Sequence, residues 1–142
     1  MTEEEWLRDR ILWKCEKNNL LNNGAQKFAE LSDQEKAFVS DKWTSEDEPI
    51  IAFLDQDKQR STIITCREIV SLRKGEIHSI CLQEINKKVL VPDDTETKEE
   101  IAEQQETLLL GRKKIPIWVP AGKAYFGMMN LLQIFPLTVP GS

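Results

Sequence analysis

Residues 61–82 read STIITCREIVSLRKGEIHSICL, and this stretch decides the predicted fold. Its first part, 61–66, is rich in the β-branched side chains that suit a half-buried, pleated surface. Two further strand-like runs, 68–73 and 77–82, flank Lys74-Gly75. Glycine supplies the positive φ that a tight hairpin turn needs. The stretch therefore predicts consecutive antiparallel strands.

Further strand-like segments lie on both sides of this stretch, at 50–54, 84–91, 107–110 and 115–119. Most are short apolar runs bounded by turn residues, which is typical of strands. Together with 61–82 they predict a small curved antiparallel sheet of about seven strands.

The spacing of apolar residues changes near residue 121, where a C-terminal helix is predicted. Ala124, Met128 and Leu131 fall on one helical face, and Pro136 ends the pattern. Phe126 lies off this face, so the helix needs a second element or a partner to cover it. We expect an α+β fold in which this helix caps the sheet.

The N-terminal residues are predicted to form a helical extension. Acidic side chains open a helix over 3–22, which favours the helix macrodipole. Its apolar side chains form two ridges: Trp6, Trp13 and Leu20 in one, and Leu7, Ile11 and Cys15 in the other. Ser32 and Glu35 have the spacing of a capping box, which predicts a second helix.

The composition indicates one globular domain. The chain has 142 residues, of which 40% are apolar and 30% charged, so it can bury its own core. We expect a helical extension over 1–45 that packs on a domain over 46–136, followed by a tail over 137–142.

The same composition favours a cytoplasmic protein without cofactor or metal. Cys15, Cys66 and Cys81 are odd in number and lack the spacing of metal ligands, which is typical of reduced thiols. No apolar run approaches the roughly 20 residues needed to span a bilayer. The acidic start, residues 1–5, lacks the basic and apolar regions of a signal peptide.

A spaced set of residues links the strands to a known family. It comprises Ile64-Thr65, Arg67, Gly75-Glu76, Ser79-Ile80, Leu82, Glu84-Ile85 and Val89. A strand that ends in T-x-R and leads into a G-E-x-x-S-I-x-L-x-E-I hairpin resembles bacterial PH-like and GRAM-type domains of the pleckstrin-homology superfold. The resemblance covers about residues 48–135 and implies seven strands followed by one closing helix. It also implies a noncatalytic scaffold for peptides, proteins or lipid headgroups.

The loop that would hold a lipid phosphate departs from the family's pattern. Lipid-binding members place basic residues on the first two strands and the loop between them. Here that loop carries Asp55 and Asp57 beside Lys58 and Arg60. Because the two carboxylates would repel a phosphate, we do not expect a phosphoinositide ligand.

The residues do not indicate an enzyme, and no catalytic residue is assigned. His78 is the single histidine, and on a strand it faces the side opposite to Cys81. A pairing of His78 with Cys66 stays open; the alternative is a histidine that packs within the sheet. The sequence contains none of the P-loop, dinucleotide-binding, zinc-protease or nucleophile-elbow motifs.

Residues 93–106 concentrate the negative charge of the chain. Seven carboxylates stand against Lys98: Asp93, Asp94, Glu96, Glu99, Glu100, Glu103 and Glu106. One interpretation is a solvated loop or short exposed helix. The other is a docking surface for a basic protein, which would raise the association rate and select partners.

Trp6 and Trp13 also allow two interpretations. Tryptophans on such a helix most often contribute to a core. Alternatively they form a partner-binding face, because Trp is enriched at interface hot spots. Homodimerisation through this helix is a variant of the second interpretation.

Two functions remain. The first is a non-enzymatic protein-binding module, in its most concrete form an immunity or inhibitor protein that docks a basic partner. The alternative is a membrane-surface or lipid-headgroup-binding module that uses Lys58, Arg60 and Lys113-Lys114, although membrane binding is less favoured. Nucleic-acid binding is not expected, because the basic run 111–114 is short.

Overall fold

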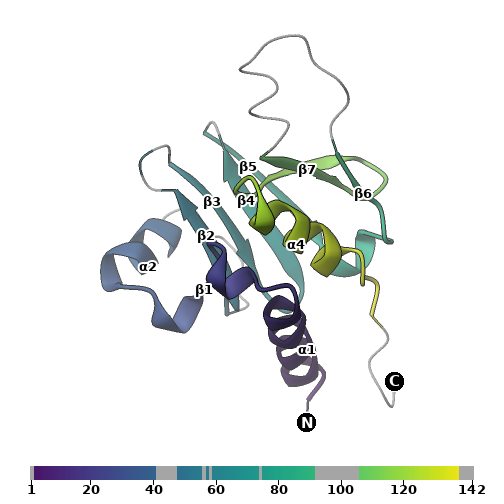
Figure 1. Ribbon diagram of the computed structural model, residues 1–142, viewed down its shortest axis with the longest axis horizontal. Coiled ribbons are helices and arrows are strands. Elements are labelled where there is room, and N and C mark those ends of the chain that lie inside the picture. Colours follow the sequence, from purple (N-terminus) through teal and green to yellow (C-terminus); the bar gives the residue numbers. More distant parts are fainter. Residues whose placement is uncertain are drawn as a thin grey trace.

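The computed structural model describes residues 2–40, 48–55, 57, 59–73, 75–91 and 106–137. The described part is an α+β fold of three α-helices and two antiparallel sheets (Figure 1). In chain order the elements are α1 (Glu3–Lys17), η1 (Leu20–Asn22), β1 (Gln26–Lys27), η2 (Phe28–Glu30), α2 (Asp33–Ser40), β2 (Ile51–Asp55), β3 (Arg60–Ile64), β4 (Glu68–Arg73), β5 (Glu76–Cys81), η3 (Leu82–Glu84), β6 (Val89–Leu90), β7 (Thr107–Leu110), β8 (Ile115–Trp118) and α4 (Lys123–Leu132).

The strands divide between two sheets rather than forming the one sheet that the sequence predicted. The large sheet has the order β1-β2-β3-β4-β5, and the small sheet has the order β6-β7-β8. Each pair of neighbours is antiparallel, as the hairpin signals predicted. Strand β1 was not predicted, because two residues are too few to show an alternating pattern.

The predicted strand over 84–91 is wrong for most of its length. Leu82–Glu84 forms a 3-10 turn, and Asn86 and Lys87 have φ values of +52° and +59°. Such left-handed residues cannot continue a strand. Only Val89–Leu90 therefore pairs with β7. The helix predicted over 3–22 likewise ends early, at Lys17, because Asn19 is left-handed at φ +58°.

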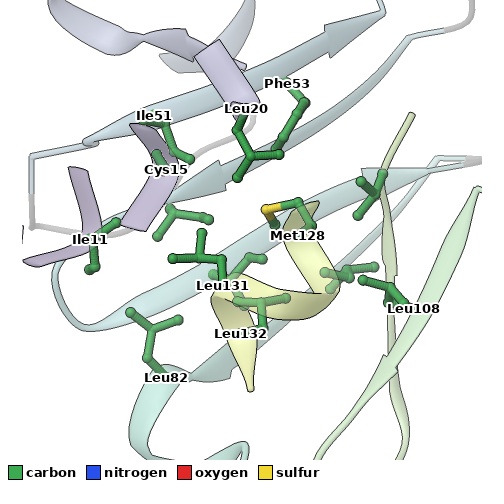
Figure 2. Packing of buried hydrophobic residues seen from close by; sticks show 14 of the residues in the cluster. Ile11, Cys15, Leu20, Ile51, Phe53, Leu82, Leu108, Met128, Leu131 and Leu132 are labelled. Carbon is green, nitrogen blue, oxygen red and sulfur yellow. The ribbon is translucent and has the colours of Figure 1, made fainter. Parts of the chain in front are cut away.

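The main core lies between one face of the large sheet, α1, α4 and the small sheet (Figure 2). Ile51, Ile64 and Ile69 stand in register across β2, β3 and β4 and point into it. The helices and the small sheet contribute six residues that are labelled in Figure 2: Ile11, Cys15, Met128, Leu131, Leu132 and Leu108. Burial of these side chains is the largest favourable contribution to folding.

Helix α4 is covered on more than one side, as its apolar residues predicted. The sheets cover one side, and α1 and η1 pack against another. Gly127 lets η1 approach closely: a Cβ at this position would lie 2.7 Å from Leu20 Cδ2 and 3.2 Å from the Asn18 carbonyl oxygen. Phe126 remains 63% exposed.

A second, smaller core lies on the opposite face of the large sheet. Leu31 and Val39 pack there against Ala52 and Ile63. The capping box predicted at the start of α2 is confirmed. The Ser32 N–H donates to Glu35 Oε1 at 3.0 Å, and the Glu35 N–H donates to Ser32 Oγ at 3.1 Å.

Two buried hydroxyl groups join the large sheet to β8 without a backbone ladder. Ser71 Oγ accepts a hydrogen bond from the Trp118 N–H at 2.8 Å, and Thr62 Oγ1 donates to the Trp118 carbonyl oxygen. Ser71 Oγ also lies 2.8 Å from Thr62 Oγ1. We call this pair, Thr62 and Ser71, the hydroxyl bridge. It fixes the end of β8 over the large sheet.

Candidate protein-binding groove

An acidic groove of about 480 Å³ opens where the β2–β3 turn, the start of β7 and the end of β8 meet. Its described lining residues are Gln26, Glu35, Leu54, Asp55, Asp57, Arg60, Glu106, Trp118, Pro120 and Ala121. They come from five separate stretches of the chain, which the two sheets and α2 bring together.

Arg60 is held in the groove by two carboxylates and an aromatic ring. Its Nη2 donates to Asp55 Oδ2 at 2.7 Å, and its Nη1 donates to Glu106. The guanidinium carbon lies 4.9 Å from the centroid of a Trp118 ring, within the range of a cation–π contact. Trp118 Nε1 in turn donates to Glu106 Oε2 at 3.2 Å. The Arg60 side chain is only 18% exposed as a result.

These contacts keep the guanidinium charged. Burial by itself would lower the pKa of Arg60, but the hydrogen bond to Asp55 and the charge of Glu106 outweigh burial and raise that pKa above its ordinary value. Arg60 is therefore occupied by neighbouring carboxylates, and it is not offered to an anionic ligand.

The groove retains a negative charge after this pairing. Its described lining residues include four carboxylates and one guanidinium, which together carry a net charge of −3. Neither Glu35 nor Asp57 forms an ion pair within the described residues. Leu54 and Pro120 add an apolar wall. The arrangement suits a cationic side chain, whose stem can lie along the apolar wall while its charge meets the carboxylates.

Hydrogen bonds from neighbouring elements support the groove. The hydroxyl bridge holds the backbone of Trp118. The Tyr125 hydroxyl donates to the Thr107 carbonyl oxygen at 2.7 Å, which ties α4 to the start of β7 beside Glu106. Burial raises the pKa of this hydroxyl, so it remains a donor.

Most of the predicted acidic docking residues fall outside the described part of the chain. They are Asp93, Asp94, Glu96, Glu99, Glu100 and Glu103. Glu106, the last member of the same acidic run, does line the groove. Glu35 and Trp118 were not predicted as site residues, because residues so distant in sequence show no common motif.

The two tryptophans of α1 differ in their surroundings. Trp6 is half-buried against the main core, whereas Trp13 is 41% exposed. Arg10 Cζ lies 4.4 Å from the centroid of a Trp13 ring, and Lys17 Nζ lies 5.0 Å from it. The buried ridge of α1 consists of Leu7, Ile11 and Cys15, the second of the two predicted ridges.

The histidine and the cysteines are not gathered at one place. His78 Nε2 lies 3.3 Å from Glu76 Oε2 on the same strand. Cys15, Cys66 and Cys81 are not joined to one another by disulfide bonds. Burial, with a smaller contribution from Glu16, raises the pKa of the Cys15 thiol to about 12. Such a thiol is almost entirely protonated near neutral pH.

Two further findings concern the described residues as a set. They contain no group of three or more His, Cys, Asp or Glu side chains arranged to hold a metal ion. Among the helices of the same set, none is both long and apolar enough to cross a membrane.

Comparison with known proteins found no similar protein. No family model matches the chain, no curated protein matches it, and no solved structure matches it.

Proposed function

We propose that the chain is a non-enzymatic protein-binding module on a PH-like scaffold, and that the acidic groove docks a basic partner. Its most concrete form is an immunity or inhibitor protein, which needs a complementary surface and no chemistry of its own. The groove described above carries the proposal, because it is concave and acidic and contains two carboxylates that pair with no cation of the described residues.

The order of elements supports the PH-like scaffold. Four hairpin-linked strands, β2–β5, precede the three antiparallel strands β6–β8, and α4 follows them. The T-x-R motif lies in the turn between β3 and β4, where Thr65 Oγ1 accepts from the Arg67 N–H at 3.1 Å and from the Glu68 N–H at 3.0 Å. A threonine in this place has a structural role that its motif alone did not reveal.

The distribution of charge supports a basic partner. The acidic run 93–106 leads along the chain into Glu106 at the groove. Negative charge in a concave site attracts a cationic partner and raises its association rate. Arg60 counters part of this charge, and it also fixes the positions of Asp55 and Glu106.

The test is to remove Glu35 and Asp57, the two groove carboxylates that have no ion pair among the described residues. In the double variant Glu35→Gln and Asp57→Asn, an oligoarginine peptide should associate about three- to tenfold more slowly at low salt. Glutamine can also close a capping box, so α2 should keep its N-terminus. Stopped-flow fluorescence of a dye on the peptide reports the association, because the chain has four tryptophans and its intrinsic fluorescence would not report Trp118 alone.

The matched control is the double variant Glu5→Gln and Glu16→Gln. It removes the same charge from exposed positions on α1. We expect it to slow association much less than the groove variant does. If both double variants slow association equally, the peptide senses only the total charge and the groove is not the docking site.

The membrane-surface alternative was predicted to use Lys58, Arg60 and Lys113-Lys114, and Arg60 does not suit that role. Arg60 is paired with Asp55 and Glu106 and cannot also hold a lipid phosphate. Lys58 lies outside the described residues. Sedimentation with phosphatidylserine vesicles at low salt tests this alternative, and no binding is the expected result.

A further inference from the structure

A second hollow lies at the other end of the small sheet, where two turns meet. We call these turns, residues 86–88 after η3 and 111–114 between β7 and β8, the basic turns. The Gly111 N–H donates to the Lys88 carbonyl oxygen at 2.9 Å and joins them. Gly111 has φ +72°, and a Cβ there would lie 2.9 Å from Ile80 Cδ1 and 3.1 Å from the Glu84 carbonyl oxygen. Glycine is therefore required for the 111–114 turn to lie this close to β5 and η3.

The basic turns bring together cations that are distant in sequence. Their basic side chains are all exposed: Lys87, Lys88, Arg112, Lys113 and Lys114. None of the five forms a hydrogen bond or an ion pair through its side chain within the described part of the chain. Arg60, by comparison, has two carboxylate partners. The basic turns thus hold a concentration of positive charge that the rest of the described chain does not neutralise.

The hollow beside the turns has the size of a small-ligand site. It measures about 350 Å³ and is lined, among the described residues, by Ser79, Ile80, Glu84, Asn86, Arg112, Lys113 and Ile115. Ligand pockets commonly span about 300 to 1,000 Å³. Arg112 and Lys113 supply charge, and Ser79 and Asn86 supply neutral hydrogen-bonding groups. Glu84 is the single carboxylate of this described lining.

We propose that this hollow binds a compact anion that ends in a phosphate group. The planar guanidinium of Arg112 can donate two parallel hydrogen bonds to phosphate oxygens, and Lys113 adds a point charge beside it. Two of the cations line one hollow and the other three lie on the same two turns, instead of following a long stripe, so a compact anion fits better than an extended nucleic acid. The site is separate from the β2–β3 turn, to which the family resemblance would assign a phosphate.

Pyrophosphate is the probe, and isothermal titration calorimetry is the measurement. We expect the full chain to bind it, and the double variant Arg112→Gln and Lys113→Gln to bind it at least about tenfold more weakly. Lys27→Gln with Lys123→Gln removes the same charge elsewhere and should change the affinity less than about twofold. All four side chains lack a described partner, so both variants should fold.

Vesicles distinguish a free phosphate compound from a lipid headgroup. Three results together would show that a lipid carries the phosphate. Phosphatidate vesicles retain the protein, pyrophosphate displaces the protein from them, and phosphatidylserine vesicles do not retain it. If no vesicle retains the protein but pyrophosphate binds, the ligand is a soluble compound. The proposal fails if pyrophosphate does not bind or if both double variants weaken it equally. It also fails if both kinds of vesicle retain the protein and pyrophosphate does not compete, since the basic turns then only contact a charged surface.

Discussion

Cys81 is the exposed thiol of the chain, and its neighbours should control its reactivity. Burial, followed by the charges of Glu84 and Glu68, raises its pKa above the ordinary value. The thiolate is the reactive form, so iodoacetamide should modify Cys81 slowly at about pH 8. The variant Glu84→Gln removes one negative charge, lowers that pKa and should speed the modification at the same pH. Mass spectrometry of the modified peptide gives the rate.

The same experiment includes two internal controls, the modification rates at high pH and the modification of Cys15. The rates of the two proteins should converge as the pH rises above both pKa values, because each thiol is then ionised. Cys15 is fully buried with a pKa of about 12, so it should react only when the chain unfolds. Equal rates for Cys81 in both proteins near pH 8 would show that Glu84 does not influence the thiol.

Single residues show where sequence-based prediction is reliable and where it ends. The capping box of Ser32 and Glu35 was predicted because its partners are three positions apart. The ion pair of Arg60 and Glu106 spans 46 positions, and no local pattern connects them. The sequence placed Arg60 in a loop of mixed charge beside Asp55 and Asp57, whereas the fold also brings the distant Glu106 to it. The groove therefore could not be assembled from the sequence, although its charge was already visible.

The hydroxyl bridge should contribute to the stability of the contact between the sheets. Replacing Ser71 with alanine leaves the buried Trp118 N–H without its acceptor. A buried donor without a partner costs about 1–3 kcal/mol. We expect Ser71→Ala to lower the free energy of unfolding by about that amount, measured by urea denaturation. Ser79→Ala, an exposed position on β5, should change it by less than about 0.5 kcal/mol. Similar effects of the two variants would argue against the bridge.

The contact between α4 and η1 depends on the absence of a side chain at Gly127. Alanine would gain about 1 kcal/mol of helix propensity there. Its methyl group would however lie 2.7 Å from Leu20 Cδ2, and such overpacking costs about 1–3 kcal/mol. We expect Gly127→Ala to destabilise the protein when Leu20 is present. Urea denaturation of Gly127→Ala, of Leu20→Ala and of the double variant completes a double-mutant cycle.

The informative quantity in this cycle is the coupling between the two positions. Leu20→Ala alone removes a fully buried side chain and should cost about 2–5 kcal/mol. In that background the methyl group of Ala at position 127 has more room, so the same substitution should cost less or even stabilise. An unchanged cost would show that the Asn18 carbonyl oxygen, 3.2 Å away, limits the space instead.

The arrangement of the whole molecule was predicted in class but not in detail. Apolar periods identified most of the strands and the closing helix, because each depends on local spacing. They could not show that β8 belongs to a separate, small sheet and contacts the large sheet through Thr62 and Ser71. That attachment depends on two hydroxyl groups within strands, and serine and threonine occur in many strands without such a role. The division into two sheets places the groove and the basic turns at opposite ends of β7.

This separation predicts how the two sites influence each other. Glu106 precedes β7 and Gly111 follows it. The two residues are five steps of about 3.4 Å apart along the strand, so the distance between them is about 17 Å. The Debye length is about 8 Å at physiological ionic strength and about 30 Å at 0.01 M. At physiological salt, Glu35→Gln with Asp57→Asn should therefore leave pyrophosphate affinity unchanged. At 0.01 M salt the same variant should bind pyrophosphate more tightly, because it no longer opposes the anion through the field of the groove. Calorimetry at both salt concentrations measures this difference. If the variant binds pyrophosphate more weakly than the unchanged protein does at 0.01 M salt, pyrophosphate binds elsewhere than at the basic turns.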